Sequence, residues 1–490
     1  MNFETVIGLE VHAQLATRSK LFCPCPTDSF GRTANRFICP VCTGQPGVLP
    51  VLNRQAVLLA VRAALSLNAR IHPVSVFARK NYFYPDLPKS YQISQYEHPL
   101  SEHGTMEVKS DGKIKRIRIR RIHLEEDAGK LLHAVGSRKL DYSLVDFNRS
   151  GIPLIEIVSE PDISNPEEAF QYLNALKAVL RSIGVSRCDM EKGEMRCDAN
   201  ISLRPENSPE NTLGVKTEIK NLNSFKAVKE SLAYETERQA EILNSNGRLA
   251  QETRLWDAQR GVTQPMRSKE EAHDYRYFPD PDLAPLTISD DEVEEIRKNL
   301  GELPAARSGR FQSQYQLSAY DAQVLVSEKS LADYFEEALS SANGRSLSPK
   351  PAANWILNEL MGKLNEAKLS IGESPVSPRD LADFLAKIQE GTLPSAAAKA
   401  LFEKAFREGK SLSELLAEPG TLQSSDPAAL SEWVEASIRE NPKAVEDFLT
   451  GKEAALGALV GAVMKKAGGK AGPKTVQQML RSKLQKKDIP

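Results

Sequence analysis

The chain has 490 residues, 41% of them hydrophobic and 26% charged, a composition that is typical of globular proteins and excludes collagen-like, disordered and membrane-spanning classes. Its 64 lysines and arginines nearly balance its 65 aspartates and glutamates, so any affinity for nucleic acid must come from local patches. Because six cysteines are too few for a disulfide scaffold and no apolar stretch approaches the roughly 20 residues that span a bilayer, we expect a cytoplasmic protein with no membrane partner.

The first predicted element is a strand over residues 6–15. Since side chains alternate between the two faces of a strand, Glu10, His12 and Gln14 share one face, and apolar residues occupy the other. Glu10 and His12 would lie roughly 6 to 7 Å apart, which is close enough for both to reach one hydrated cation.

Four cysteines follow in two close pairs, Cys23 with Cys25 and Cys39 with Cys42. Four thiolates arranged in this way match the tetrahedral coordination of zinc and leave no open position for a substrate. We therefore predict a structural zinc knuckle over residues 23–42. Four free thiols in a loop-rich region are the alternative interpretation.

Residues 113–121 alternate basic side chains with isoleucine. A strand of this kind either guides phosphates or is a solvated edge strand protected by its charge. The change of phase at Arg120 and Arg121 predicts a bulge at that point.

The alternation recurs in residues 121–127, 196–203 and 216–220, and it places polar side chains on one face of each segment. These include His123, Glu125 and Asp127, then Asp198 and Asn200, then Lys216, Glu218 and Lys220. Each segment alone is explained by a half-exposed strand, but together they predict a concave polar site.

Glu156 strengthens this prediction because it lies in the apolar run 154–158. A carboxylate in such surroundings needs a cation or a hydrogen-bond donor. Carboxylates with one imidazole suit Mg²⁺ or Mn²⁺, the usual companions of a phosphorylated substrate, better than catalytic zinc.

From about residue 289 the pattern changes to helices with clear caps. Ser289 and Glu292 form a capping box, and Ser377 with Pro378 opens a later helix that ends before Gly391. We predict three domains, with edges at residues 1–290, 291–407 and 408–490.

The C-terminal segment 465–490 holds eight basic residues and one acidic residue. Apolar residues at Val476, Leu480 and Leu484 mark an amphipathic helix behind a glycine-rich hinge. Contact with RNA phosphates and a merely solvated basic helix are both consistent with this composition.

The sequence lacks a phosphate-binding G-x-x-x-x-G-K-[ST] loop, a G-x-S-x-G elbow and an H-E-x-x-H helix. If ATP is used, the chain holds it in some other way.

Long motifs in a fixed order extend over essentially the whole chain. They occupy residues 6–12, 79–86, 89–95, 123–130, 153–162, 196–202, 220–225 and 274–279. Through these motifs the chain resembles the B subunits of the glutamyl/aspartyl-tRNA amidotransferases.

The resemblance implies an α+β fold in which a catalytic cradle domain, similar to glutamine synthetase and carrying the zinc knuckle, precedes an all-α helical domain and a helical tail related to the YqeY family. It implies that ATP phosphorylates the side-chain carboxylate of misacylated Glu-tRNA(Gln) or Asp-tRNA(Asn), and that ammonia then displaces phosphate. An amidase-type A subunit would release the ammonia from glutamine, a small C subunit would complete a heterotrimer, and the misacylating synthetase is a further expected partner.

The resemblance also suggests roles for individual residues. Glu10, His12 and Glu125 match metal-binding positions for Mg²⁺ or Mn²⁺, while zinc on Cys23, Cys25, Cys39 and Cys42 would be architectural. Further candidates for a second cation, ammonia guidance or positioning are Glu126, Asp127, Glu156, Asp198 and Glu218, with Lys220 for phosphate. The expected tRNA-binding residues of the tail are Lys465, Lys466, Lys470, Lys474, Arg481 and Lys483.

Other interpretations predict different behaviour. An archaeal relative specific for the glutamine tRNA carries an inserted domain, for which 490 residues leave little room. A zinc-containing tRNA-binding protein without catalysis would use the acidic face as a structural cation site. A metal-dependent phosphodiesterase would cleave RNA without ATP.

Overall fold

The computed structural model describes residues 2–110, 112–136, 138–209, 212–266, 275–341, 347–418, 427–467 and 471–485. The chain divides into two compact units, Met1–Pro304 and Ala305–Pro490. Among the residues described, no helix has the length and apolar character needed to cross a membrane.

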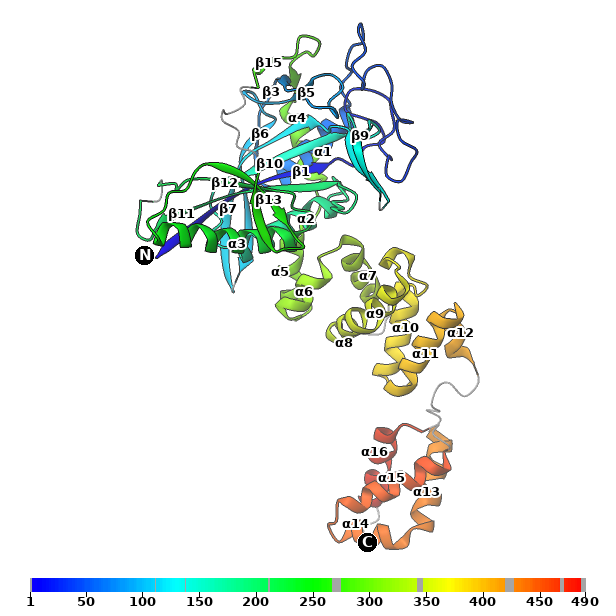
Figure 1. Ribbon diagram of the computed structural model, residues 1–490. Coiled ribbons are helices and arrows are strands. Elements are labelled where there is room, and N and C mark those ends of the chain that lie inside the picture. The colour runs from blue at the N-terminus through cyan, green and yellow to red at the C-terminus, as the bar shows by residue number, and fades with distance from the viewer. Residues whose placement is uncertain are drawn as a thin grey trace. The chain divides into compact units, whose positions relative to one another are not determined.

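A nine-stranded sheet is the framework of the first unit, with strands in the order β14-β13-β12-β11-β1-β10-β7-β6-β2 (Figure 1). The strands are β1 (Phe3–Gln14), β2 (Arg70–Ile71), β6 (Ser101–Ser110), β7 (Lys113–Glu126), β10 (Pro153–Ser159), β11 (Met195–Pro205), β12 (Thr217–Lys220), β13 (Glu252–Asp257) and β14 (Val262–Pro265). The segments with predicted polar faces are therefore neighbours in one sheet, from β12 to β7.

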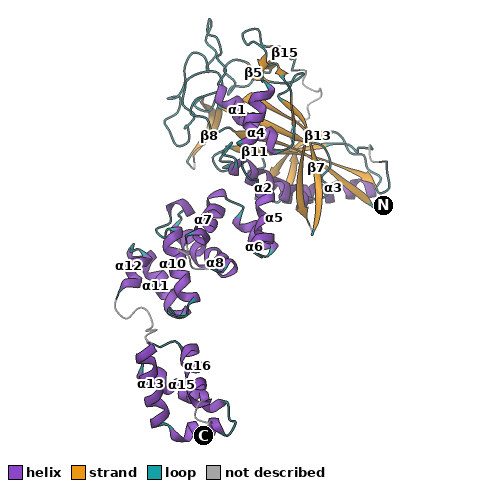
Figure 2. Cartoon of the chain, turned by 180° about the vertical axis from the view of Figure 1, so that it is seen from behind, coloured by secondary structure: helices purple, strands orange, loops and turns teal. Residues whose placement is uncertain are grey.

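The apolar face of this sheet packs against three helices (Figure 2). They are α1 (Arg54–Ser66), α2 (Pro166–Ser182) and α3 (Phe225–Asn244). Leu9 and Val11 of β1 are buried in one core with Leu173 and Leu176 of α2. This packing leaves the opposite face, which carries Glu10 and His12, for chemistry.

The predicted bulge lies where β7 meets β10. Val158 pairs with Arg121, but the next residue, Ser159, pairs with Ile119. Arg120 is thus the extra residue, and it resets the alternation just before His123. Lys115 and Arg118 of the same strand form ion pairs with Glu168 and Asp162.

A small sheet with the order β15-β4-β5 lies beside the end of β7. It comprises β4 (Ala78–Asn81), β5 (Tyr91–Ser94) and β15 (Phe278–Pro279). The Ser94 hydroxyl donates to Glu125 over 3.3 Å, and the Gln92 amide donates to the Glu126 carbonyl over 2.8 Å. These bonds fix the small sheet next to the polar face.

Two further pairs of strands belong to the first unit. The strands β3 (Val74–Ser75) and β16 (Leu286–Thr287) form one pair, and β8 (Lys130–Val135) and β9 (Arg138–Asp146) form a separate ribbon.

Helix α4 (Asp290–Lys298) begins with the predicted capping box, in which Ser289 and Glu292 bond reciprocally. Val293 and Ile296 pack against the core of the first unit, and Arg54 pairs with Glu292 at 2.7 Å. Through this packing α4 belongs to the first unit, which extends to Pro304.

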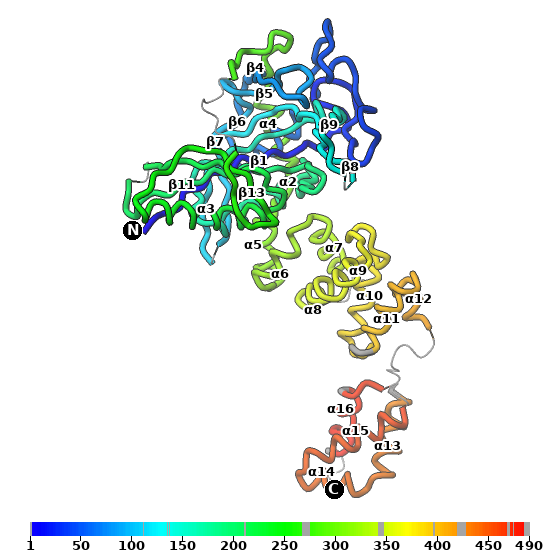
Figure 3. The backbone as a smooth tube through the Cα atoms, in the orientation of Figure 1, coloured from blue at the N-terminus to red at the C-terminus, as the bar shows by residue number. Residues whose placement is uncertain are grey.

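The second unit is helical (Figure 3). Its helices are α5 (Pro304–Gln314), α6 (Ala319–Leu325), α7 (Lys329–Ser340), α8 (Pro349–Trp355), a π-helical turn (Ile356–Leu360), α9 (Met361–Ala367), a 3₁₀ turn (Ile371–Glu373), α10 (Pro378–Gln389), α11 (Ser395–Glu408), α12 (Leu412–Ala417), α13 (Pro427–Glu440), α14 (Pro442–Leu449), α15 (Ala454–Lys466) and α16 (Pro473–Gln485).

The described residues of this unit form two separate apolar cores. The first core holds residues of α5–α12, among them Leu412 and Leu415 of α12. The second core holds α13–α16, including Val476, Leu480 and Leu484 of the predicted amphipathic helix. Part of the predicted hinge, residues 468–470, lies outside the described residues.

Candidate active site

Two histidines and one glutamate face each other across three adjacent strands. His12 of β1 is in register with Glu156 of β10, which is in register with His123 of β7. Directly opposed residues project to the same side of a sheet, and Glu125 projects to that side too because it follows His123 by two residues. The pairing of the strands therefore gathers four polar side chains.

The atoms of this group lie close enough to share a cation. His12 Nε2 is 3.4 Å from Glu125 Oε1 and 3.2 Å from Glu156 Oε2. His123 Nε2 lies 3.8 Å from Glu125 and 3.6 Å from Glu156. One ligand atom each from His12, Glu125 and Glu156 lies within 4.8 Å of the others. We call these three residues the acid triad.

Burial makes the triad a good fit for a divalent ion. Glu125 is 3% exposed and Glu156 is 8% exposed, so their mutual repulsion is poorly screened by water. Carboxylate oxygens with one imidazole match the donors that Mn²⁺ and Mg²⁺ accept. A bound cation would offset the repulsion between the two carboxylates.

The electrostatics of the triad favour charged carboxylates. Burial alone would lower the pKa of His12, but its bond to Glu156 and the charge of Glu125 raise it. Burial opposes ionisation of Glu156, yet the neighbouring His123 and His12 hold its pKa below the usual value. The two acids are therefore ready to bind a cation at neutral pH.

Glu10, predicted as a metal ligand, lies outside the triad. It is in register with Asp198 of β11 and accepts a 3.3 Å hydrogen bond from Asn200. Burial and the charge of Glu156 raise its pKa. Glu156 joins His12 and Glu125 in the triad because its strand, β10, lies between β1 and β7.

A second group of acids lies on the next strands. The Lys220 ammonium is 2.9 Å from Asp198 and 3.0 Å from Glu218, and Thr253 donates to Glu218 over 2.7 Å. The charges of Asp198 and Glu218 raise the pKa of Lys220 against the effect of burial. The Lys220 ammonium thus lies as a counter-ion between two carboxylates on the same face of the sheet as Glu10.

Asp127 and Glu126, two other predicted residues, take different positions. Asp127 accepts hydrogen bonds from Arg196 at 2.7 Å and Gln14 at 2.9 Å. Glu126 lies on the opposite face of β7 from Glu125, where its carboxylate contacts Lys89 and accepts from the Ile93 amide at 2.9 Å. Asp127 therefore borders the polar face, and Glu126 does not.

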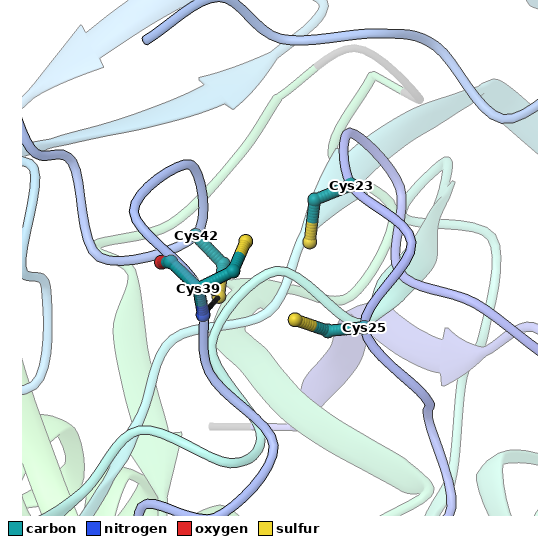
Figure 4. Close-up of side chains that lie close together, drawn as sticks. All are labelled: Cys23, Cys25, Cys39 and Cys42. Carbon is teal, nitrogen blue, oxygen red and sulfur yellow. Dashed lines mark hydrogen bonds between the residues drawn. The ribbon is translucent and has the colours of Figure 1, made fainter.

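The four predicted zinc ligands converge (Figure 4). Their sulfur atoms lie within 4.8 Å of one another, and the Cys39 amide donates to Cys42 Sγ over 3.2 Å. A hydrogen bond from Cys23 and the nearby Lys20 ammonium lower the pKa of Cys42 to about 4. A cluster of four thiols with one readily ionised member fits a tetrahedral metal such as zinc.

Comparison with known proteins identifies the family. The sequence model of the GatB/GatE catalytic domain matches residues 5–294, and that of the GatB domain matches residues 333–484. The B subunit of the aspartyl/glutamyl-tRNA(Asn/Gln) amidotransferase of Carboxydothermus hydrogenoformans is 53% identical over 484 residues, covering 99% of both chains. This chain belongs to the same family of amidotransferase B subunits.

Other members are similar over the same extent. The corresponding protein of Thermoanaerobacter pseudethanolicus is 51% identical over 486 residues, covering 99% of this chain and all of its own. That of Geobacter sulfurreducens is 49% identical over 484 residues, again covering 99% of this chain. The family assignment thus includes both compact units.

Basic residues of the tail are partly neutralised within this member of the family. Lys466 pairs with Glu440 and Arg481 with Glu453, each at 2.6 Å, and Lys483 contacts Glu435. Lys465 is exposed. Lys470 and the side chain of Lys474 lie outside the described residues.

Sequence reasoning missed Lys80 of β4. Burial alone would lower the pKa of Lys80, but the charges of Glu125, Tyr277 and Glu156 raise it. The ammonium also lies 4.9 Å from the centre of the Tyr275 ring. Residues 79–86 and 274–279 contributed to the family resemblance, but no spacing rule relates them to the triad.

Proposed function

We propose that the chain is the B subunit of a cytoplasmic tRNA-dependent amidotransferase that forms Gln-tRNA(Gln), Asn-tRNA(Asn) or both. The γ-phosphoryl group of ATP is transferred to the side-chain carboxylate of the misacylated tRNA, which gives an acyl phosphate and ADP. Ammonia then attacks the acyl carbon, and phosphate leaves with the C–O bond electrons. The buried acid triad, on the open face of the sheet, is the observation that supports this proposal most strongly.

The acid triad would hold a Mg²⁺ or Mn²⁺ ion. Such an ion supplies charge that lowers the repulsion between the γ-phosphate and the acyl carboxylate. His12 orients Glu156 through their 3.2 Å contact, and Ser94 orients Glu125 over 3.3 Å. These bonds limit the freedom of both carboxylates before substrate arrives.

The neighbouring side chains would hold the anionic reactants. Lys80, on the small sheet, places a positive charge opposite Glu125 and Glu156, where it attracts the phosphoryl oxygens. Asp198 and Glu218 would bind a second cation or position Lys220 for phosphate. Asp127 would position Arg196, which donates a hydrogen bond to it. Glu126 would position Lys89, with which it pairs on the other face of β7.

The remaining parts of the chain would serve assembly and tRNA binding. We infer that the first unit is a cradle similar to glutamine synthetase, and that zinc on the four cysteines is architectural. We infer that the tail is related to the YqeY family and contacts tRNA through Lys465, Lys466, Lys470, Lys474, Arg481 and Lys483. An amidase A subunit and a small C subunit would complete the enzyme, and the misacylating synthetase would deliver the substrate.

Glu125→Gln tests this proposal in the assembled enzyme. Because the amide removes a charged ligand and keeps the side-chain size, we expect ATP turnover to fall by at least about 100-fold, with tRNA affinity unchanged. Loss of both properties, or of neither, would instead favour a zinc-containing tRNA-binding protein without catalysis. Glu107→Gln, on an exposed part of β6, is the matched control.

A further inference from the structure

Four tyrosine rings form a continuous row beside the acid triad. The centre of the Tyr82 ring is 6.0 Å from that of Tyr275, which is 6.1 Å from that of Tyr277. Tyr277 stacks on Tyr96 with centres 4.2 Å apart and planes 7° apart. We call Tyr82, Tyr275, Tyr277 and Tyr96 the tyrosine row. Three separate segments contribute to it.

One end of the row adjoins the reactive groups. The Lys80 ammonium lies 5.9 Å from the centre of the Tyr82 ring and 4.9 Å from that of Tyr275. Burial and the charges of Glu125 and Glu156 outweigh Lys80 and raise the pKa of Tyr277 to about 12. The Tyr277 phenol therefore stays neutral at physiological pH, and its ring lies within electrostatic reach of Glu125 and Glu156.

The other end of the row reaches the surface. Tyr96 is 46% exposed, and the Arg121 guanidinium lies 5.6 Å from the centre of its ring. The other three rings are half-buried, so the row is partly accessible along its length and has a cation near each end.

Half-exposed aromatic rings flanked by Lys and Arg are the elements that bind single-stranded nucleic acid, because bases stack on the rings and the cations attract the phosphates. The chemistry of the proposed function requires an acyl group, attached to the end of an RNA strand, to reach the triad. The acidic face itself repels phosphates, so the strand needs a cationic, aromatic path beside it.

We propose that the tyrosine row binds the unpaired 3′-terminal nucleotides of the charged tRNA and thereby brings the acyl group to Lys80 and the acid triad. This inference rests on the proposed function. Bases stack from the Arg121 and Tyr96 end inward, and the terminal ribose lies near Tyr82. The adenine ring of ATP is the competing occupant. We favour the RNA end because the row is open at Tyr96, whereas a free nucleotide requires an enclosing pocket.

The test uses Tyr96→Leu and Tyr277→Leu in the enzyme assembled with its partner subunits, with Tyr142→Leu as the matched control. Tyr142 is an exposed tyrosine on β9, in the same unit. We expect the KM for charged tRNA to rise about tenfold in the row variants, since one stacked base contributes a factor of this order. The KM for ATP and the kcat at saturating tRNA should stay near wild type.

A second measurement does not depend on catalysis. Uncharged tRNA with 2-aminopurine in place of its terminal adenine should lose fluorescence on binding to the wild type, because stacking quenches this base. Tyr96→Leu and Tyr277→Leu should abolish the quenching, while Tyr277→Phe, which keeps the ring, should preserve it. Tyr96 is half exposed, so its replacement is expected to leave the fold intact.

A raised KM for ATP with an unchanged KM for tRNA would overturn the proposal and assign the row to the nucleotide. Unchanged values for both substrates, with quenching intact, would overturn it in favour of a packing role. Quenching by a wild-type assembly that releases no phosphate with charged tRNA would contradict the proposed function, yet it would support binding of the RNA end by the row.

Discussion

His12 and Glu156 define which carboxylates can share a cation. Their side chains meet at 3.2 Å because they are directly opposed in β1 and β10. Glu10 is only two residues from His12 and feels the charge of Glu156, but it is in register with Asp198 and accepts its hydrogen bond from Asn200. The geometry therefore ranks Glu156 above Glu10 as a ligand.

Glu156→Gln and Glu10→Gln test this ranking. Because Glu156 is the third member of the triad, we expect its amide variant to lower Mn²⁺ affinity at least about tenfold, and Glu10→Gln to lower it less. Electron paramagnetic resonance of free Mn²⁺ measures the affinity directly, and Glu107→Gln serves as the control. A greater loss of Mn²⁺ affinity in Glu10→Gln than in Glu156→Gln would contradict this ranking and favour Glu10 as the ligand beside His12 and Glu125.

The sequence could predict which residues share a face but not which strands are adjacent. Alternation has a period of two and depends only on neighbouring residues, so it correctly placed Glu10 and His12 on one side of β1. The pairing of β1 with β10 joins residues at least 140 positions apart along the chain, and no local pattern specifies such a register. The roles proposed for Glu156 and Lys80 depend on such long-range order.

At the scale of single elements, the cysteine loops illustrate the importance of a charged neighbour. The Lys20 side chain is buried, and its ammonium lies 2.8 Å from the Phe37 carbonyl and 3.5 Å from Cys42 Sγ. A zinc ion with four thiolates carries a net negative charge. Lys20 would compensate part of that charge, and its bond to the Phe37 carbonyl anchors the loop.

Lys20→Met should therefore release zinc faster. We expect release to a chelating dye to accelerate about tenfold, a typical effect of removing a group that supports metal ligands. Lys20→Arg keeps the charge and should show a smaller change. Equal release rates for the wild type and Lys20→Met would mean that the ammonium has no effect on the metal.

Glu336 of α7 bonds to Arg307 and Arg310 of α5, and its charge depends on pH. Hydrogen bonds from Arg310, Arg307 and Tyr315 lower the pKa of Glu336 from 4.5 to about 2. A lowered pKa in the folded state contributes stability above the unfolded pKa, and this contribution disappears as the pH falls toward the folded value.

Glu336→Gln should accordingly unfold at lower urea concentration than the wild type at pH 6, and the difference should shrink between pH 4.5 and 2. Urea unfolding followed by hydrogen exchange in α5 and α7 measures this. Lys363, in α9, pairs with Glu366 at the surface, so Glu366→Gln should show little difference at either pH. If the difference in urea midpoint between Glu336→Gln and the wild type stayed constant with pH, ionisation of Glu336 would be excluded as its cause.

For the whole molecule, the proposed binding of tRNA must be reconciled with a nearly neutral chain. The formal net charge is −1, and three of the basic residues expected to contact tRNA already pair with acids of the tail. Each of these basic side chains must give up its acidic partner to contact a phosphate of tRNA. This exchange lowers its net contribution to the binding free energy.

Lys465→Ala should consequently weaken tRNA binding more than Lys466→Ala. Each phosphate contact that is lost lowers the salt dependence of log Kd by about one, so filter binding at several salt concentrations distinguishes the two. Lys226, exposed on α3 in the first unit, provides the control. An effect of Lys226→Ala equal to that of Lys465→Ala would show that the tail is not the preferred contact.

The central claim is that this chain transfers a phosphoryl group to the carboxylate of a charged tRNA. The most direct measurement is phosphate release from ATP by the chain assembled with its amidase and small partner chains, in the presence of Glu-tRNA(Gln), of uncharged tRNA, or of no tRNA. Release that requires the glutamyl group is the predicted result. Release that is absent, or that is the same with uncharged tRNA, would contradict the claim.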